Sequence, residues 1–225
     1  KYDEEKGLQI GSTLTLKELE ASNIVKEKYP ALYQGSSSIA STQIRNVATI
    51  VGNICNAVPS ADSAPSLLVL GAKVKILSSK GERIVPIEEF FTGVCRTVLK
   101  RNEVVVEVQI PAPKAGVKSV YYSHTARRAL DLAMVGVAVS GTVKDGKFED
   151  VKIGLGAVAI TPKRALEAEA LVNGKEVTKE LIEEAAELAC MKDCSPITDM
   201  RATSEYRREM VRVLTRNGLC EVAGL

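Results

Sequence analysis

Residues 43–53 of the chain read QIRNVATIVGN, and residues 59–65 read PSADSAP. Thr49, Gly52 and Asn53 place a hydroxyl group, a backbone without a side chain and an amide within five residues of one another. A glycine lets main-chain N–H groups approach an anion or a polar ligand closely, because no Cβ stands in the way. Asp62 follows nine residues later, directly before an apolar segment. Its carboxylate would either cap a helix or accept hydrogen bonds from ligand hydroxyls.

The same residues also fit a purely structural role. Short stretches of Gly, Asn and Thr are common in turns, where the Asn and Thr side chains bond to their own backbone. In that case Asp62 would be an ordinary helix N-cap. The spacing alone names no ligand, so a binding site and a structural loop both remain open at this point.

Composition excludes some classes of protein. The chain has 225 residues, 45% of them hydrophobic and 26% charged, which is typical of a globular protein with one large or two modest domains. The formal net charge is +2, from 30 basic and 28 acidic residues, so no electrostatic footprint for a nucleic acid or a membrane surface stands out. No stretch approaches the roughly 20 apolar residues of a membrane span. The single histidine, His124, excludes a His-rich metal site, and five scattered cysteines indicate reduced thiols in a cytoplasmic protein.

The N-terminal half mixes helical and strand patterns. Thr15 and Glu18 fit a capping box at the start of a helix. Residues 39–59 show neither helix nor strand periodicity and predict a loop packed inside the protein. A Val-rich strand at 104–110 is halted by Pro111 and Pro113, where we place a domain boundary between residues 1–111 and 112–225.

The C-terminal half has a simpler pattern. Val-rich strands are predicted at 120–122, 133–143 and 151–160, the last two joined by the hairpin sequence KDGK at 144–147. Helices are predicted at 164–172, at 178–191, and at 204–217, where Gly218 would end the last one. Three strands followed by three helices indicate an α+β fold, with helices on one face of an antiparallel three-stranded sheet.

The stretch from Gln43 to Asn53, with Pro59 and Asp62 after it, resembles the second FAD-binding signature of the flavin subunits of molybdenum hydroxylases, the family of xanthine dehydrogenase and carbon monoxide dehydrogenase. That signature runs roughly Q-I-R-N-x-A-T-x-G-G-N and then S-P-x-x-D-x-x-P. Further segments resemble the same family in the same order: IGS at 10–12 with LTL at 14–16, GER at 81–83 with FF at 90–91, residues 103–111, RRALDLA at 127–133, and PITDMR at 196–201 with EYRR at 205–208. These ordered motifs span nearly the whole chain. A globular α+β domain with unrelated ligand chemistry would have to match all of them by coincidence.

The resemblance implies a fold and a set of cofactor-binding residues. The fold is that of the vanillyl-alcohol oxidase and para-cresol methylhydroxylase flavoproteins, present in part and followed by a C-terminal α+β domain. The residues implied to contact FAD are Thr49, Ile50, Val51, Gly52, Asn53, Asp62, Val105, Tyr122 and Ser123. On the residues alone, Tyr122 is equally well an ordinary aromatic of a strand. We expect no catalytic acid or base and no metal ligand in this chain, and a structural role for His124.

The resemblance also implies partners. In this family a large subunit carries the molybdopterin cofactor and a small subunit carries two [2Fe–2S] clusters, and the flavin passes their electrons to NAD⁺ or another acceptor. The redox chemistry belongs to the cofactor, while the protein holds and tunes it. The substrate is chosen by the molybdenum subunit.

Three departures from the family pattern have consequences. Val51 stands where the family has the first of two glycines, and Ser123 stands where it has a lysine. The first FAD signature, a glycine-rich loop that cradles the pyrophosphate, would precede Lys1. Without that loop, we expect residues 1–225 alone to bind FAD weakly or not at all. Val51 and the missing first signature motivate a second hypothesis, a flavin-free scaffold that docks the other subunits. A yellow or colourless preparation would distinguish the two.

Overall fold

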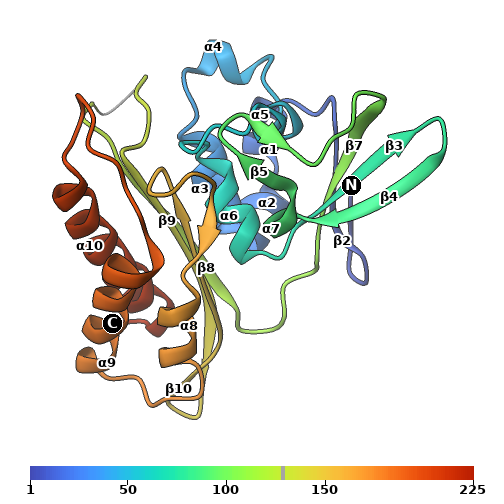
Figure 1. Ribbon diagram of the computed structural model, residues 1–225. Helices are drawn as coiled ribbons and strands as arrows, with labels where there is room; N and C mark the ends of the chain where they lie inside the picture. The colour runs from blue at the N-terminus through green and yellow to red at the C-terminus, as the bar shows by residue number, and fades with distance from the viewer. Residues whose placement is uncertain (128–129) are drawn as a thin grey trace.

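A computed structural model describes residues 1–127 and 130–225, and two sheets organise this part of the chain (Figure 1). The N-terminal half contains a five-stranded antiparallel sheet in the order β1-β2-β7-β3-β4. Its strands are β1 (Tyr2–Asp3), β2 (Gly7–Gly11), β7 (Glu103–Ile110), β3 (Lys73–Ser78) and β4 (Gly81–Pro86). A small two-stranded sheet, β5 (Phe91–Gly93) and β6 (Arg96–Thr97), follows helix α7 (Ile87–Phe90).

The helices of the N-terminal half are short, and four of them begin at a Ser or Thr side chain that caps the first turn. They are α1 (Leu16–Ala21), α2 (Asn23–Lys28), α3 (Pro30–Ser37), α4 (Thr42–Arg45), α5 (Ile50–Asn56) and α6 (Ser63–Val69). The capping box predicted at the start of α1 is confirmed, because the Thr15 side chain accepts from the Glu18 amide while the Glu18 carboxylate accepts from the Thr15 amide. In the described residues, none of these helices nor any later one is both long and apolar enough to span a bilayer.

The prediction that residues 39–59 form a loop without helices is wrong. Helices α4 and α5 lie in this range, and each begins at a hydroxyl cap. Ser41 Oγ accepts from the Ile44 amide at 3.3 Å, and Thr49 Oγ1 accepts from the Gly52 amide at 2.9 Å. A helix of one or two turns is too short to show a 3.6-residue hydrophobic period, which is why the pattern missed both.

The C-terminal half contains a second antiparallel sheet in the order β11-β10-β9-β8. Its strands are β8 (Lys118–His124), β9 (Val135–Lys144), β10 (Lys147–Gly156) and β11 (Lys163–Arg164). The three predicted strands are therefore present, and a two-residue strand extends the sheet at the edge of β10. Asp145 and Gly146 both have positive φ, which is the backbone of the tight hairpin turn that the KDGK sequence predicts.

One face of this sheet is covered by the helices of the C-terminal half (Figure 1). These are α8 (Leu166–Val172), α9 (Lys179–Leu188), a π-helical turn η1 (Ala189–Asp193) and α10 (Ser204–Ala223). The prediction that α10 ends at Gly218 is wrong, because the helix continues to Ala223. A Cβ at Gly218 would lie 2.5 Å from the Val139 Cγ2 atom on β9, so this glycine lets the helix approach the sheet closely.

The other face of the same sheet is covered by α3 and α6 of the N-terminal half, a layer that sequence patterns did not predict. Tyr121 and Ala138 pack with Ala31 and Val69 across this boundary. The Ser140 hydroxyl donates to the Val69 carbonyl at 2.9 Å. Residues 135–141 of β9 are all buried as a result, which explains why this strand has no polar face.

Gly154 gives a direct test of this packing. A Cβ at position 154 would lie 2.5 Å from the carbonyl oxygen of Pro65 in α6, which is backbone and therefore rigid. We expect Gly154→Ala to lower the free energy of unfolding by about 1–3 kcal/mol, the usual cost of overpacking. The midpoint temperature of thermal unfolding should then fall by roughly 3–10 °C. Gly11→Ala is the matched control, because a Cβ there meets nothing within 4 Å; equal unfolding temperatures for both variants would contradict the close contact.

Candidate cofactor-binding site

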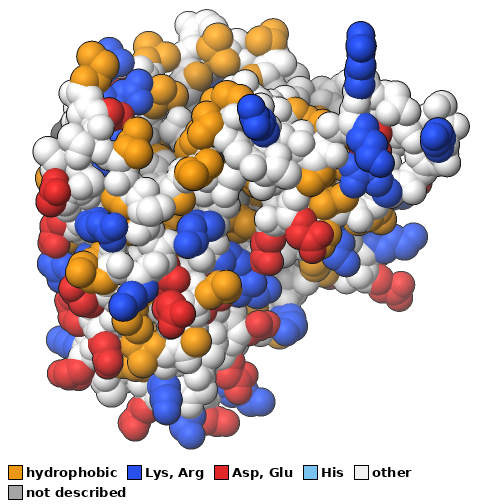
Figure 2. Space-filling view, in the orientation of Figure 1, with side chains coloured by type: hydrophobic (Ala, Val, Ile, Leu, Met, Phe, Trp, Pro, Cys, Tyr) orange, Lys and Arg blue, Asp and Glu red, His pale blue; other side chains and the backbone are white. Residues whose placement is uncertain are grey.

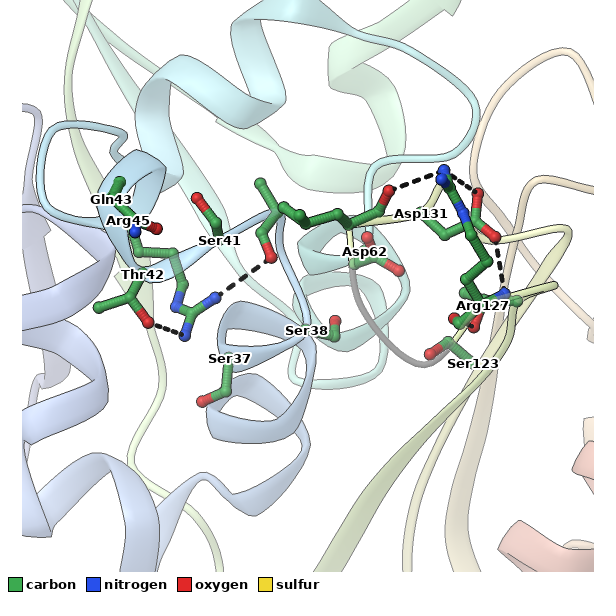
Figure 3. A pocket seen from close by; sticks show the side chains of 13 residues that line it. Ser37, Ser38, Ser41, Thr42, Gln43, Arg45, Asp62, Ser123, Arg127 and Asp131 are labelled. Atoms are coloured by element: carbon green, nitrogen blue, oxygen red, sulfur yellow. Dashed lines mark hydrogen bonds and ion pairs between the residues drawn. The ribbon is translucent and has the colours of Figure 1, made fainter.

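A cleft lies where the two halves meet, and we call it the central cleft. It consists of two hollows of about 450 and about 420 Å³ that share Ala40, Asp62, Arg127, Leu130 and Asp131. The N-terminal wall carries the hydroxyls of Ser37, Ser38, Ser41 and Thr42, and the C-terminal wall carries Ser123 and Thr125. Figure 3 shows Asp62 between the serines at the end of α3 and the pair Arg127–Asp131 on the opposite side.

The N-terminal wall is held by Arg45, whose side chain is only 12% exposed. Its guanidinium group donates to the Ile39 carbonyl at 3.0 Å and to the Glu20 carboxylate at 3.3 Å. The next residue after Ile39, Ala40, has a left-handed backbone conformation with φ of +49°, so the chain turns sharply at the rim of the cleft. Arg45 therefore stabilises the loop that carries Ser41 and Thr42.

Asp62 has an unusual environment for a residue in the N-cap position. Its side chain makes no capping hydrogen bond to α6. It instead accepts a hydrogen bond from the Tyr121 hydroxyl, with 2.6 Å between the oxygen atoms. Burial raises the pKa of the Asp62 carboxyl group, and the bond from Tyr121 opposes that rise. The expectation of a plain N-cap is therefore wrong, and an acceptor group lies in the wall of the cleft.

The residues of the FAD signature divide into two groups. Thr49 caps α5, Ile50 and Val51 are buried in the core of the N-terminal half, and Gly52 is exposed beside them. None of these four lines either hollow. Asn53 does line the cleft, and its Oδ1 atom accepts from the Ser63 hydroxyl at 2.5 Å.

Tyr122 and Ser123, both predicted to contact FAD, lie next to each other on strand β8, but their side chains point to opposite faces of the sheet. Successive side chains of a strand point to opposite faces. Ser119, Tyr121 and Ser123 face the N-terminal half, where Ser119 Oγ accepts from the Ala31 amide and Ser123 lines the cleft. Tyr122 packs instead against the core of the C-terminal half, where burial and the Glu221 carboxylate raise its pKa.

Two further predicted residues lie away from the cleft. Val105 is 7% exposed on β7 and belongs to the N-terminal core. His124 lies against α10, with 3.0 Å between its Nε2 atom and the Tyr206 hydroxyl. Within the motif RRALDLA, positions 128 and 129 lie outside the described residues.

Sequence patterns missed Tyr121, Arg127 and Asp131 as cleft residues. The alternation of β8 would have identified Tyr121, because it shares a face with Ser123. Arg127 and Asp131 are in contact, because the Arg127 amide donates to the Asp131 carboxylate at 2.9 Å. This bond lowers the pKa of the Asp131 carboxyl group. No short-range signal predicts that this pair lies across the cleft from Ser38 and Ser41.

The cleft suits a ligand rich in hydroxyl and phosphate groups. Ser37 Oγ is buried at the cleft wall and has no hydrogen-bond partner among the described residues. A buried polar atom without a partner is costly, and a bound polar ligand would satisfy it. The described residues contain no group of three or more His, Cys, Asp or Glu side chains that could hold a metal ion.

Two family models match the chain along almost its whole length. Residues 2–113 match the FAD binding domain in molybdopterin dehydrogenase, and residues 120–222 match the CO dehydrogenase flavoprotein C-terminal domain. The chain is an FAD-binding subunit of the molybdenum hydroxylase family. This flavin subunit thus contains an FAD-binding domain, and its α+β fold with a C-terminal sheet packed by helices is confirmed.

Similar proteins agree with this assignment. The xanthine dehydrogenase FAD-binding subunit of Escherichia coli O157:H7 is 35% identical over 219 residues, covering 97% of the flavin subunit and 75% of the relative. The glyceraldehyde dehydrogenase medium chain of Sulfolobus acidocaldarius is 35% identical over 217 residues, covering 96% and 76%. Among solved structures, carbon monoxide dehydrogenase from Hydrogenophaga pseudoflava gives a TM-score of 0.91 at 33% identity, covering 96% of the flavin subunit and 74% of that chain.

The raised pKa of Asp62 predicts a dependence of stability on pH. Because the carboxyl pKa is higher in the folded than in the unfolded state, the folded state binds the proton more tightly, and this contribution is lost as pH rises through the folded pKa. We expect Asp62→Asn, without FAD, to unfold at a higher temperature than the wild type at pH 7. The difference should shrink as the pH is lowered towards the usual carboxyl range, where Asp62 becomes neutral. A lower unfolding temperature for Asp62→Asn at pH 7 would contradict this account.

Proposed function

We propose that the flavin subunit binds FAD in the central cleft and passes electrons from the [2Fe–2S] clusters of a small subunit to an external acceptor such as NAD⁺. In this arrangement a large subunit carries molybdopterin and oxidises the substrate. Bound FAD would supply the electron-accepting and electron-donating chemistry. The protein residues bind the cofactor, orient it and exclude water from it.

The observation that carries this proposal is the Asp62 carboxylate in the wall of a polar cleft. One of its oxygens is bound by Tyr121, which leaves the other to accept from a hydroxyl of the cofactor. Ser38 and Ser41 add hydroxyl groups that both donate and accept, on the wall opposite Ser123. Such a set of groups fits the sugar, ribityl and phosphate portions of a flavin dinucleotide.

Both halves of the chain contribute to the proposed site. The N-terminal wall comes from residues 37–62, and the C-terminal wall comes from residues 123–127 and 130–132 and from Arg201. We therefore propose that the segments divided at 111/112 act as one binding unit. The residues Thr49, Ile50, Val51 and Gly52 would contribute main-chain groups or support α5, because they lie beside the two hollows.

The position of Val51 removes one argument for the flavin-free scaffold. The scaffold hypothesis rests partly on the extra Cβ at this position. The Val51 side chain is 8% exposed and packs into the core of the N-terminal half, so its bulk does not enter the cleft. The departure from two glycines is thus compatible with a cofactor, provided that the cofactor contacts the main chain.

Exposed hydrophobic side chains support the existence of partner subunits. Figure 2 shows them gathered on the upper part of one face of the molecule. The most exposed in the described chain are Met200 at 99%, Val47 at 75%, Ile197 at 69%, Ile160 at 67% and Leu225 at 65%. Such side chains commonly lie at protein interfaces. The relatives from Sulfolobus and Hydrogenophaga are named medium chains, which implies larger and smaller companions.

Removal of the Asp62 carboxylate tests the binding site. We expect Asp62→Ala to weaken FAD binding by about tenfold or more, the loss typical of a hydrogen bond to a charged group. The measurement is a fluorescence titration of the FAD-free native complex with FAD. Asp150→Asn is the control, because Asp150 pairs with Lys114 outside the cleft. A wild-type complex that binds no FAD would overturn the proposal. If Asp62→Ala and the wild type bind FAD with equal affinity, FAD does not bind at Asp62.

The acceptor is tested separately. We expect anaerobic addition of NAD⁺ to the dithionite-reduced native complex to restore the oxidised flavin absorbance band and to produce NADH. The control is the FAD-free complex, in which NADH should not form. Reoxidation by an artificial dye, without reoxidation by NAD⁺, would keep the flavin role and exclude NAD⁺ as the acceptor.

A further inference from the structure

Tyr121 connects the C-terminal sheet to the central cleft. Its ring is 5% exposed and packs with Ala31, Val69 and Ala138 between the two halves. Its amide donates to the Gln34 Oε1 atom at 2.7 Å, which fixes the backbone of β8 against α3. The ring therefore has little freedom, and its hydroxyl group has a defined position at the edge of the cleft.

A glycine on the neighbouring strand leaves room for this hydroxyl. Gly136 on β9 is paired with Ser123, one step along the same face of the sheet from Tyr121. A Cβ at position 136 would lie only 2.9 Å from the Tyr121 hydroxyl oxygen. Any larger residue at 136 would displace the hydroxyl, so the strand pair is shaped to let Tyr121 reach Asp62.

The Tyr121 hydroxyl is well suited to hold a carboxylate. Burial and the nearby Asp62 charge raise the pKa of the Tyr121 phenol well above its usual value. The phenol therefore stays protonated and remains a donor at neutral pH. Among the described residues, no other side chain donates a hydrogen bond to the Asp62 carboxylate.

Other charged groups share the cleft with Asp62 without bonding to it. These are Arg45, Arg127, Asp131 and Arg201. Arg45 is engaged by Glu20 and main-chain carbonyls, and Arg127 by Asp131 and the Leu130 carbonyl. Asp131 has a lowered carboxyl pKa, so its titration falls below that of Asp62.

We infer that Tyr121 is a positioning residue that acts through Asp62. Its hydroxyl binds Oδ1 and favours the ionised carboxylate, so that Oδ2 remains an oriented acceptor for a hydroxyl group of the cofactor. This inference rests on the proposed function, because it assigns a task to Tyr121 in FAD binding. Tyr121 itself does not have to touch the cofactor.

The test compares FAD affinity across pH for the wild type and Tyr121→Phe in the FAD-free native complex. Loss of the hydroxyl should weaken FAD binding about tenfold at pH 7. It should also shift the acid limb of the binding profile to higher pH, because the bond that lowers the Asp62 pKa is gone. Tyr29→Phe is the matched control, since it removes another buried phenol, bonded to the Pro111 carbonyl at 3.1 Å and outside the cleft.

A double-mutant cycle separates positioning from a general effect on folding. In the Asp62→Ala background, Tyr121→Phe should change FAD affinity by less than twofold, because the group through which Tyr121 acts is absent. Additive losses in the cycle, or an unshifted pH profile for Tyr121→Phe, would overturn the inference. A wild-type complex that binds no FAD would overturn the proposed function and this inference together. Wild-type binding with unchanged Tyr121→Phe affinity would overturn this inference alone.

Discussion

The C-terminal sheet is covered by helices on both faces, and the position of the central cleft depends on this packing. One cover, α8 to α10, belongs to the same half, while α3 and α6 come from the other half of the chain. Small residues allow the second contact, because Gly154 and Gly156 meet Pro65 directly and Ser140 bonds to the backbone of α6. The N-terminus of α6 is thereby brought beside β8. Asp62 precedes that helix, so the cleft forms only where the two halves dock.

Arg207, which is buried, and Asp62, which is partly buried, have different surroundings. Arg207 is 4% exposed and donates to the Met134 carbonyl at 2.6 Å and to Asp199 at 2.9 Å. These bonds engage both of its terminal nitrogen atoms, while the buried Nε atom has no partner among the described residues. Asp199 also accepts from the Arg201 amide at 2.8 Å, which links Arg207 to the loop that carries Arg201. Asp62 receives one bond from a neutral phenol, which leaves its charge only partly compensated. The two groups differ in location, because Arg207 is enclosed by main-chain carbonyls and Asp199, whereas the second oxygen of Asp62 lies in the wall of a cleft that a ligand can enter.

Local signals predicted the parts of the fold that depend on neighbouring residues. The Thr15 capping box, the KDGK hairpin and the long strands of the second sheet all involve partners close in the chain. The errors concern either short elements or distant contacts. Helices α4 and α5 are too brief for a period, and Gly218 serves a contact with Val139 that no local pattern contains. Tyr121 and Tyr122 are indistinguishable as residue types, and only the alternation of β8 and the docking of α3 decide which of them meets Asp62.

The departures from the family signature acquire a physical meaning once side-chain directions are known. The Val51 side chain points into the core of the N-terminal half. It fills apolar volume there, which a glycine would leave unfilled. Position 123 points into the cleft, so the exchange of lysine for serine removes a charge from the site itself. The first departure concerns stability and the second concerns the electrostatics of the proposed cofactor site. Because the cleft needs both halves, any ligand that binds there also stabilises their docking, since a ligand that binds only the docked form shifts the equilibrium towards it.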